Sequence, residues 1–377
     1  MCGRKNKSKR TSAKNEQESE QREKRGGGER ERESREEETT SGNELGRNFG
    51  SKKLYAYYIF ALKSRASMSH KGYGKLILFG EHFVVYKVPA LVAAVADYTD
   101  CEVKLIPGGS GISGEDNRPA VPGYKVEKKE EHEEAVKLVL THMGCDFLSQ
   151  GVEVTYSGNL TAVSGIGASA AATVSLARAV ATAQGKTLTE EQINQAGYEG
   201  EKGYHGTPSG IDNTAATYGG VLRFQRTEGD PSFVTKKLKT PVEVVYASTG
   251  ITASTSKVVA DVRSKKEADE AWFAGLIGKY EQLVAKGETA LDAADWPELG
   301  QLLNENHTLC QELTVSCKEL DTLVDAARAA GAIGAKMSGT GRGGLMLALT
   351  PGKESQDKVA EALLKAGAAQ VWKTTFA

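Results

Sequence analysis

The sequence predicts an α+β protein with two domains, and three observations lead to this prediction. From residue 73 onward, strand-like and helix-like segments alternate without a detectable repeat. A segment that ends in proline, residues 236–241, separates an earlier set of these segments from a later set. Glycine-rich turns occur in both sets, around residues 164–167 and 339–344, and we expect them to face each other across a cleft.

Residues 68–240 are expected to form the first domain. Its runs of alternating apolar and polar residues are typical of half-buried strands, and its Ala-rich and Glu-rich runs have the periodicity of helices. The expected strands are 75–79, 90–95, 101–106, 152–156 and 220–224, and the expected helices are 128–143, 169–183, 189–203 and 210–217.

Residues 241–377 are expected to form the second domain. It begins with an apolar strand, 242–247, directly after Pro241. Long helices are expected at 254–290, 296–311 and 316–330, followed by strands at 333–337 and 345–349, a final helix and an edge strand.

Residues 1–67 are predicted to be a disordered, charged N-terminal extension. Up to about residue 53 they are mainly Lys, Arg, Glu, Ser and Gly, so they cannot bury enough apolar surface to offset the entropy of ordering. A transit peptide would be poor in acidic residues, and the apolar run 54–62 is too short to span a bilayer. We expect Met68 to be the functional start; a native N-terminus at residue 2 would contradict this.

Charge and cysteine content exclude some classes of function. The formal net charge of −1 gives no overall field that favours nucleic acid or an anionic membrane. The five cysteines form no Cys-x-x-Cys pair, which suits a reducing compartment and a packing role. The chain ends in Thr-Phe-Ala rather than in a peroxisomal Ser-Lys-Leu signal. Cytoplasm is therefore the expected location, with a peroxisome-like organelle as the alternative.

A glycine-rich turn, residues 164–170, joins the strand 152–156 to the helix 169–183. Its glycines allow backbone N–H groups to approach a ligand, and the positive end of the following helix favours an anion there. We therefore expect this loop to bind phosphate. A Walker loop is excluded because no Gly-Lys-Ser/Thr follows, and the dinucleotide fingerprint is incomplete because residues 181–191 predict no second strand.

Three further segments carry polar residues next to glycine. The strand that begins at Gly74 carries Lys75 and ends in a Gly-Glu-His turn, and the run 200–213 places Asp212 in the first turn of a helix. The third segment, 336–346, is another glycine-rich turn. Taken singly, Lys75 fits a charge at a strand edge, and Asp212 fits an acid at a helix start. The turn 336–346 fits a bulged hairpin. The combination is more informative than any one of them.

The order of these motifs resembles the GHMP small-molecule kinases. Residues 75–82 are similar to the first motif of that family, 158–171 to its second and 336–347 to its third, so that the resemblance runs from about Lys71 to the C-terminus. The run His205-Gly206-Thr207-Pro208-Ser209-Gly210-Ile211-Asp212-Asn213 is similar to the members that act on mevalonate.

The resemblance implies a fold, a reaction and its partners. The first domain would be ribosomal-protein-S5-like and the second ferredoxin-like, with ATP and Mg²⁺ in the cleft between them. The reaction would be ATP-dependent phosphorylation of the primary hydroxyl of mevalonate, a step of isoprenoid and sterol biosynthesis. The partners would be small molecules rather than nucleic acid or membrane, and the chain would form a homodimer.

The resemblance also implies roles for individual residues. Asp212 and Lys75 would be catalytic, Ser169 and Glu201 would hold the metal, and Glu81, His82 and Thr255 would lie near the substrate. The residues that would contact the nucleotide are Ser164, Gly165, Ile166, Gly167, Ala168, Ser169, Ala170, Gly339 and Gly341.

The chemistry suits these residue types independently of the resemblance. An alcohol is a poor nucleophile, and a carboxylate that takes its proton typically accelerates such a step by about 10²- to 10⁴-fold. An ammonium group beside that carboxylate keeps it ionised. Alignment and charge neutralisation matter at least as much, because phosphoryl transfer is largely loose. We therefore expect Lys75 and Asp212 to act as one unit.

Five residues depart from the family pattern. Thr161 and Ala162 occupy a stretch where the family usually has proline, and Ala168 stands where it usually has a first serine. Ala172 replaces an aromatic residue of some members, and Arg342 adds a cation to a loop of small residues, where it would contact phosphate or face solvent.

Other functions stay open from the sequence. Another GHMP kinase would act on phosphomevalonate, galactose or homoserine, and a catalytically silent homologue would bind nucleotide and dock through the charged extension. The presence of both Lys75 and Asp212 favours an enzyme over the silent homologue.

Overall fold

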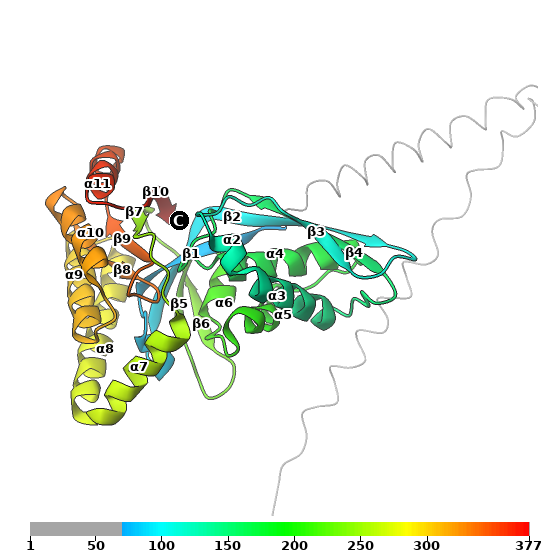
Figure 1. Ribbon diagram of the computed structural model, residues 1–377. Coiled ribbons are helices and arrows are strands. Elements are labelled where there is room, and N and C mark those ends of the chain that lie inside the picture. The colour runs from blue at the N-terminus through cyan, green and yellow to red at the C-terminus, as the bar shows by residue number, and fades with distance from the viewer. Residues whose placement is uncertain (1–69, 377) are drawn as a thin grey trace, which may run out of the picture. The chain divides into compact units, whose positions relative to one another are not determined.

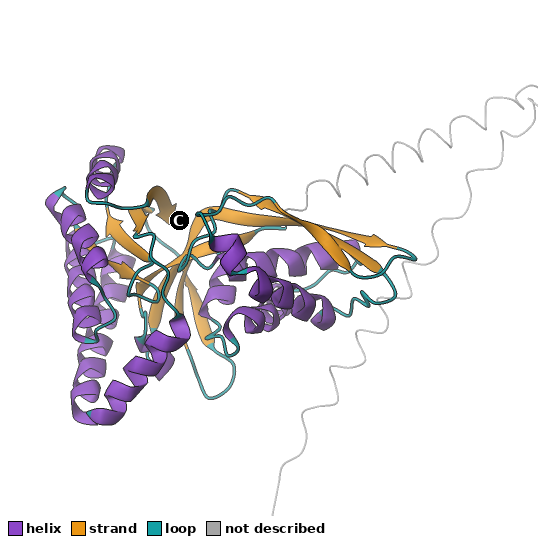
Figure 2. Cartoon of the chain, viewed as in Figure 1, coloured by secondary structure: helices purple, strands orange, loops and turns teal. Residues whose placement is uncertain are grey.

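The computed structural model describes residues 70–376 (Figure 1). The predicted extension 1–67 and the proposed start at Met68 lie outside these residues. The described chain mixes helices and strands, so the predicted α+β class is confirmed (Figure 2). None of the helices in this range is both long and apolar enough to cross a membrane.

The first sheet has six strands in the order β3-β4-β2-β5-β6, with β1 also paired to β2. All neighbouring pairs are antiparallel except β3 and β4. The strands are β1 (Gly72–Phe79), β2 (Ala90–Ile106), β3 (Ile112–Asp116), β4 (Gly151–Gly158), β5 (Val221–Gln225) and β6 (Ser232–Lys236).

Strand β2 differs from the sequence prediction, which had two strands with a break at residues 96–100. The structure has one continuous strand of 17 residues. Its first part pairs with β1 and β5, and β4 pairs with the second part from Thr99 to Ile106. The polar residues 97–100, which suggested a break, are held extended by these partners. Strands β3 and β6 were not predicted, because both are short and largely polar.

Helices cover one face of this sheet, as Figure 1 shows for α3 to α6. Helix α4 packs on β1 and β2, and almost all of its residues are buried. Gly72 of β1 permits this packing, because a Cβ there would lie 2.1 Å from the carbonyl oxygen of Ala171. The helical segments of this half are η1 (Phe83–Tyr86), α2 (Tyr124–Glu127), α3 (Lys129–His142), α4 (Ala168–Ala183), α5 (Glu190–His205) and α6 (Ile211–Tyr218).

The second sheet has four antiparallel strands in the order β10-β7-β9-β8. They are β7 (Val242–Ser248), β8 (Gly334–Ser338), β9 (Leu345–Leu349) and β10 (Gln370–Phe376), which is at the edge as predicted. The accompanying helices are α7 (Thr255–Ala268), α8 (Glu270–Ala293), α9 (Trp296–Glu312), α10 (Lys318–Ala329) and α11 (Lys353–Lys365). The single helix predicted at 254–290 is divided at Asp269, which leaves the helical conformation and caps α8 by accepting a hydrogen bond from the Trp272 N–H.

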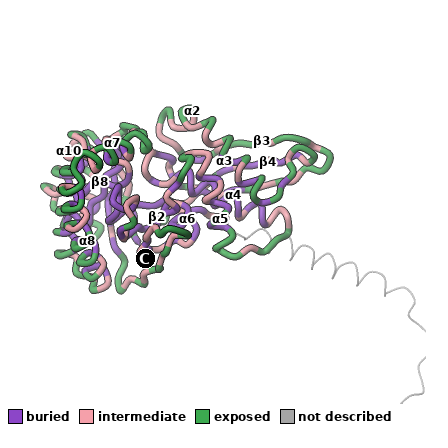
Figure 3. Tube along the Cα trace, turned by 90° about the horizontal axis from the view of Figure 1, so that it is seen from below, coloured by how far each residue is buried: buried purple, intermediate pink, exposed green. Residues whose placement is uncertain are grey.

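One continuous apolar core joins the two sheets (Figure 3). The ring of Phe83 stacks on Tyr280 at 4.3 Å, and the Tyr280 hydroxyl donates a hydrogen bond to the carbonyl of Pro89. Strand β6 ends at Lys236 and β7 begins at Val242 in the other sheet, close to the expected change of domain. The described residues 70–376 nevertheless belong to one compact unit, so the division into two domains stays a prediction.

Candidate active site

A cavity of about 890 Å³ is lined by segments from both halves of the chain. The lining includes the end of β1, the loop before α4, the start of α6, the start of α7 and the turn after β8. These segments include residues of the three motifs 75–82, 158–171 and 336–347, and of the run 200–213. The structure therefore brings together residues that lie more than 250 positions apart in the chain.

Lys75 and Asp212 meet at the wall of this cavity. Lys75 is buried in β1, and its Nζ lies 3.0 Å from Oδ1 of Asp212, the second residue of α6. The same ammonium group donates a hydrogen bond of 2.9 Å to the carbonyl of Gly165. Asp212 keeps 27% of its side chain exposed, so one carboxylate group is both paired with a cation and open to the cavity.

The glycine loop wraps around the Lys75 side chain. Gly165 and Gly167 have φ angles of 97° and 76°, which side chains disfavour, and a Cβ on Gly167 would lie 3.2 Å from Cγ of Lys75. The Lys75 N–H donates to the carbonyl of Ile166 at 2.7 Å. Gly167 is also the N-cap of α4 and has no side chain to occupy the first amides of the helix. The first turn of α4 is therefore suited to an anion.

The third glycine motif lies beside this loop, but its two predicted glycines differ. Gly339 lines the cavity, and a Cβ there would lie 3.6 Å from Cα of Gly165. Gly341 is absent from the lining and faces Val315, whose carbonyl oxygen would lie 2.0 Å from an added Cβ. Gly341 thus shapes the turn from behind, and Gly339 is the one that faces the cavity.

Glu201 is the most unusual carboxylate of the site. It is buried on α5, and neither carboxylate oxygen has a hydrogen-bond partner in good geometry within the described chain. Burial raises the pKa of Glu201 to about 8, and the charge of Asp212 adds to the rise. The nearby Ser169 hydroxyl and the Lys75 ammonium lower this pKa. A buried carboxylate without a hydrogen-bond partner among the described residues, next to a hydroxyl and 3.7 Å from the His205 imidazole, fits a hard cation such as Mg²⁺.

The three residues expected near the substrate have different surroundings. The imidazole Nε2 of His82 lies 2.6 Å from the carbonyl oxygen of Thr340, so this nitrogen carries a proton and donates it. Burial lowers the pKa of His82, which favours the neutral ring. Thr255 Oγ1 lies 2.8 Å from Oγ1 of Thr340, at the start of α7. Thr340 therefore links two of the expected residues.

Glu81 has a different partner from the expected one. Its side chain has no exposed area, and its carboxylate forms an ion pair with Lys336 of β8, whose side chain is equally buried. The Lys336 ammonium also donates to the carbonyls of Met337 at 2.7 Å and Ile77 at 3.4 Å. A direct contact between Glu81 and substrate would require this buried pair to separate. The carboxylate instead connects the first motif to the third.

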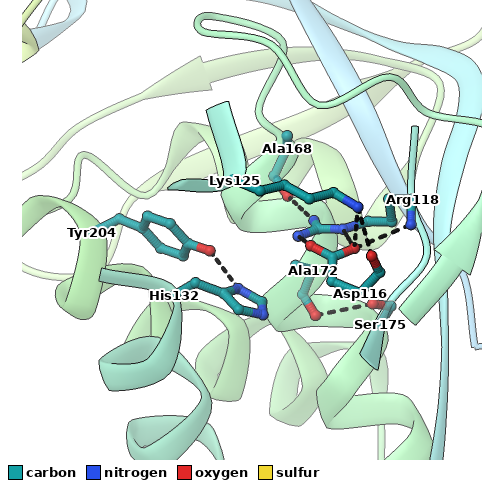
Figure 4. A network of polar contacts seen from close by, with 8 residues as sticks. All are labelled: Asp116, Arg118, Lys125, His132, Ala168, Ala172, Ser175 and Tyr204. Carbon is teal, nitrogen blue, oxygen red and sulfur yellow. Dashed lines mark hydrogen bonds and ion pairs between the residues drawn. The ribbon is translucent and has the colours of Figure 1, made fainter. Parts of the chain in front are cut away.

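Several polar residues of the site were not predicted. Arg226 and Arg263 line the cavity, and the described residues offer neither of them a hydrogen bond or ion pair. Arg118 and Asp116 form a buried ion pair behind the glycine loop, where His132 and Tyr204 also lie (Figure 4). Except for Tyr204, which lies in the run 200–213, no motif contains these residues, and charged residues in a polar segment ordinarily indicate solvent.

The structure also shows the contacts of three residues that depart from the family pattern. Arg342 neither contacts the glycine loop nor extends freely into solvent, because it forms an ion pair with Asp261 of α7. Ala162 is buried and pairs with Ala120 in an isolated bridge, and Ala172 is buried within α4.

Comparisons with known proteins agree with this arrangement. Residues 130–220 match the family model of the GHMP kinases N terminal domain, and residues 288–369 match the model GHMP kinases C terminal. Mevalonate kinase of Thermococcus gammatolerans is 34% identical over 316 residues, which are 78% of this chain and 91% of that protein. Mevalonate kinase of Pyrococcus furiosus is 35% identical over 315 residues, with the same coverage. A crystal structure of L. major mevalonate kinase in complex with R-mevalonate has a TM-score of 0.79 and 42% identity, and covers 82% of this chain and 96% of that chain.

Removing one member of the buried pair should destabilise the protein. Lys336→Met leaves the Glu81 carboxylate buried without its cation, and we expect a loss of about 3–5 kcal/mol in the free energy of unfolding. Adding Glu81→Gln to Lys336→Met should restore part of the lost free energy of unfolding. Denaturant titration measures both, with Lys365→Met as a control, because the Lys365–Glu361 pair is exposed and should contribute little. A loss no larger than that of the control would contradict the role given to the pair.

Proposed function

We propose that this chain, which belongs to the GHMP kinase family, transfers the γ-phosphoryl group of ATP to the primary hydroxyl of mevalonate. The products would be 5-phosphomevalonate and ADP. The observation that carries the proposal is the pair of Lys75 and Asp212, 3.0 Å apart, on a cavity that the glycine loop also lines. Relatives over most of the chain bear the name mevalonate kinase, and one of them binds R-mevalonate.

Asp212 is the group that accepts the hydroxyl proton. It projects from the first turn of α6 into the cavity and pairs with the Lys75 ammonium, so an alcohol placed against it can donate its proton as the phosphoryl group arrives. Lys75 also approaches the loop through Gly165, which fixes the base relative to the phosphates. Proton acceptance and phosphate binding are therefore aligned by one side chain.

The glycine loop and α4 receive the nucleotide phosphates. The amides of the first turn of α4 and the positive end of its dipole favour the negative charge of the triphosphate. Gly339 closes the other side of the loop without a side chain that would fill the space. These contacts stabilise charge on the phosphoryl oxygens without an ionisable group of their own.

Glu201 and Ser169 fit a magnesium ion. One buried carboxylate without a hydrogen-bond partner and one adjacent hydroxyl are the oxygen donors that Mg²⁺ takes when phosphates supply the rest. Bound there, the ion would neutralise charge on the phosphate oxygens. The described residues contain no cluster of three His, Cys, Asp or Glu side chains for a metal, which agrees with a site completed by the nucleotide.

The unpaired cations suit a substrate that is itself a carboxylate. Mevalonate carries a carboxylate at the end opposite to its primary hydroxyl, and Arg226 and Arg263 line the cavity without an ion-pair partner among residues 70–376. A guanidinium binds a carboxylate through two parallel hydrogen bonds. His82 and Thr255 lie at the same wall and would orient the remaining polar groups of the substrate. The homodimer and the cytoplasmic location stay predictions.

A coupled assay tests the function directly. The full chain is incubated with ATP, Mg²⁺ and one alcohol at a time, and ADP release is followed for mevalonate, phosphomevalonate, galactose and homoserine. We expect turnover with mevalonate alone. Turnover with another of these alcohols and none with mevalonate would refute the substrate assignment, and binding of nucleotide without any turnover would favour the silent homologue.

Asp212→Asn should separate chemistry from nucleotide binding. The amide keeps the shape but cannot take the proton, so we expect kcat to fall by about 10²-fold or more, with ATP affinity near wild type. Asp230→Asn, an exposed position outside the cavity, is the control and should leave kcat unchanged. A kcat for Asp212→Asn near the wild-type value would remove this residue from the mechanism.

Glu201→Gln should change the response to Mg²⁺. The neutral amide is a poorer ligand than a carboxylate, so a higher Mg²⁺ concentration should be needed for half-maximal activity. Glu199→Gln is the matched control on α5, because Glu199 pairs with Lys202 and is absent from the cavity lining. The assignment fails if the two variants give the same Mg²⁺ titration as the wild type.

A further inference from the structure

A short segment behind the glycine loop contacts both ends of that loop. This segment, residues 116–121, is named the strap here; it runs from the last residue of β3 toward α2. Two residues before the loop begins, the Ala162 N–H donates to the carbonyl of Pro119 at 2.8 Å, and the Val121 N–H donates to the carbonyl of Ala162 at 3.1 Å. At the far end, Arg118 donates through Nη1 to the carbonyl of Ala168 at 3.1 Å.

Arg118 is the member of the strap that reaches α4. Ala168 is the first residue of this helix and stands between Gly167 and Ser169. The guanidinium group is buried, and Figure 4 shows it between the Asp116 carboxylate and the Ala168 carbonyl. Its Nε and Nη2 donate to the two oxygens of Asp116 at 2.9 and 2.7 Å, which leaves Nη1 directed at the helix.

By itself, the location of the Arg118 cation is unfavourable for the stability of the protein. A buried guanidinium loses its hydration, and the N-terminal end of a helix dipole repels a positive charge. Asp116 offsets the charge, and the ring of Tyr156 lies 5.1 Å from the guanidinium carbon. Burial would raise the pKa of Asp116, but the hydrogen bonds and charge of Arg118 outweigh it and lower that pKa to about 2. The pair is thus fully charged at neutral pH.

The neighbouring groups hold the pair rather than compete with it. Lys125 of α2 donates to the backbone carbonyl of Asp116 at 2.5 Å, and its Nζ lies 3.5 Å from the Asp116 carboxylate. The His132 ring, which also packs edge-on against Tyr156, forms a hydrogen bond of 2.6 Å with the Tyr204 hydroxyl. Burial lowers the pKa of His132 to about 4, so this ring adds no charge near the guanidinium at neutral pH.

We propose that Arg118 is a positioning residue for the nucleotide, which it serves by fixing the distance between the two ends of the glycine loop through the strap. The inference rests on the proposed function of the loop as the phosphate site. Arg118 holds the first turn of α4, and with it Ser169 and the free amides, while Pro119 and Val121 hold the entry of the loop at Ala162. Arg118 is absent from the cavity lining, so it would act through the loop rather than by contact with nucleotide or alcohol.

Binding of a non-hydrolysable ATP analogue with Mg²⁺ to the full chain tests the inference. Arg118→Gln removes the charge and the fork of donors, and we expect the Kd to rise by at least about tenfold, since small displacements of a binding group have effects of up to about 10²-fold. KM for mevalonate should stay near wild type. The Kd of Arg118→Lys should lie between the values for the wild type and Arg118→Gln, because an ammonium cannot bind the carboxylate bidentately and reach the carbonyl as well.

Arg178→Gln is the matched control. Arg178 lies in the second half of α4, pairs with Glu190 and donates to the carbonyl of Thr217 at 2.8 Å, so its loss also removes an anchor of the helix, but far from the loop. We expect loss of stability without a change in nucleotide Kd. An unchanged Kd in Arg118→Gln, or an equal rise in Arg178→Gln, would overturn the inference.

Two outcomes keep this test separate from the proposed function. If Arg118→Gln does not fold, Arg118→Lys and Asp116→Asn are compared in the same binding assay, and wild-type affinity in both would refute the inference. If the wild-type protein binds the analogue but does not phosphorylate mevalonate, the substrate assignment fails and the comparison of affinities still stands.

Discussion

The outer edge of strand β1 is the constraint on which the site depends. One edge of β1 pairs with β2, and no strand of the described chain pairs with the other. On that free edge the N–H of Lys75 donates to Ile166 in the glycine loop, and two residues later the N–H of Ile77 donates to Ser338 of the third motif. Backbone groups of a buried strand require such partners. The two glycine motifs thus lie side by side because both complete the same strand.

Side chains of the same strand complete the connection. The Lys75 ammonium donates a hydrogen bond to the Gly165 carbonyl and forms an ion pair with Asp212. Glu81, just after the strand, forms an ion pair with Lys336 in β8. The first pair remains open to the cavity, whereas the second is fully enclosed in the core that joins the two sheets. In the proposed mechanism, catalysis uses the pair that is open to the cavity. The enclosed pair holds the halves of the chain in one relative position.

The sequence predicted the parts of this site that local chain geometry encodes. Glycines with positive φ at 165 and 167, before an alanine-rich helix, specify the loop, and the resemblance supplied the partners Lys75 and Asp212. The sequence alone could not predict contacts that depend on burial by distant segments. The partner of Lys336 lies 255 residues away in the chain, and Arg118 lies in a polar segment that α4 and Tyr156 enclose. The continuous strand β2 was missed for the same reason, because β4 keeps its polar middle extended.

The central claim is that Lys75 and Asp212 act as one unit at the end of this strand, and a double-mutant cycle on kcat tests it most directly. The full chain is assayed with mevalonate and ATP as Lys75→Met, Asp212→Asn and the double variant. If the two groups form one catalytic unit, the double variant should be about as slow as the slower single variant. Losses that simply multiply would show that the lysine and the carboxylate act independently, and would contradict the account.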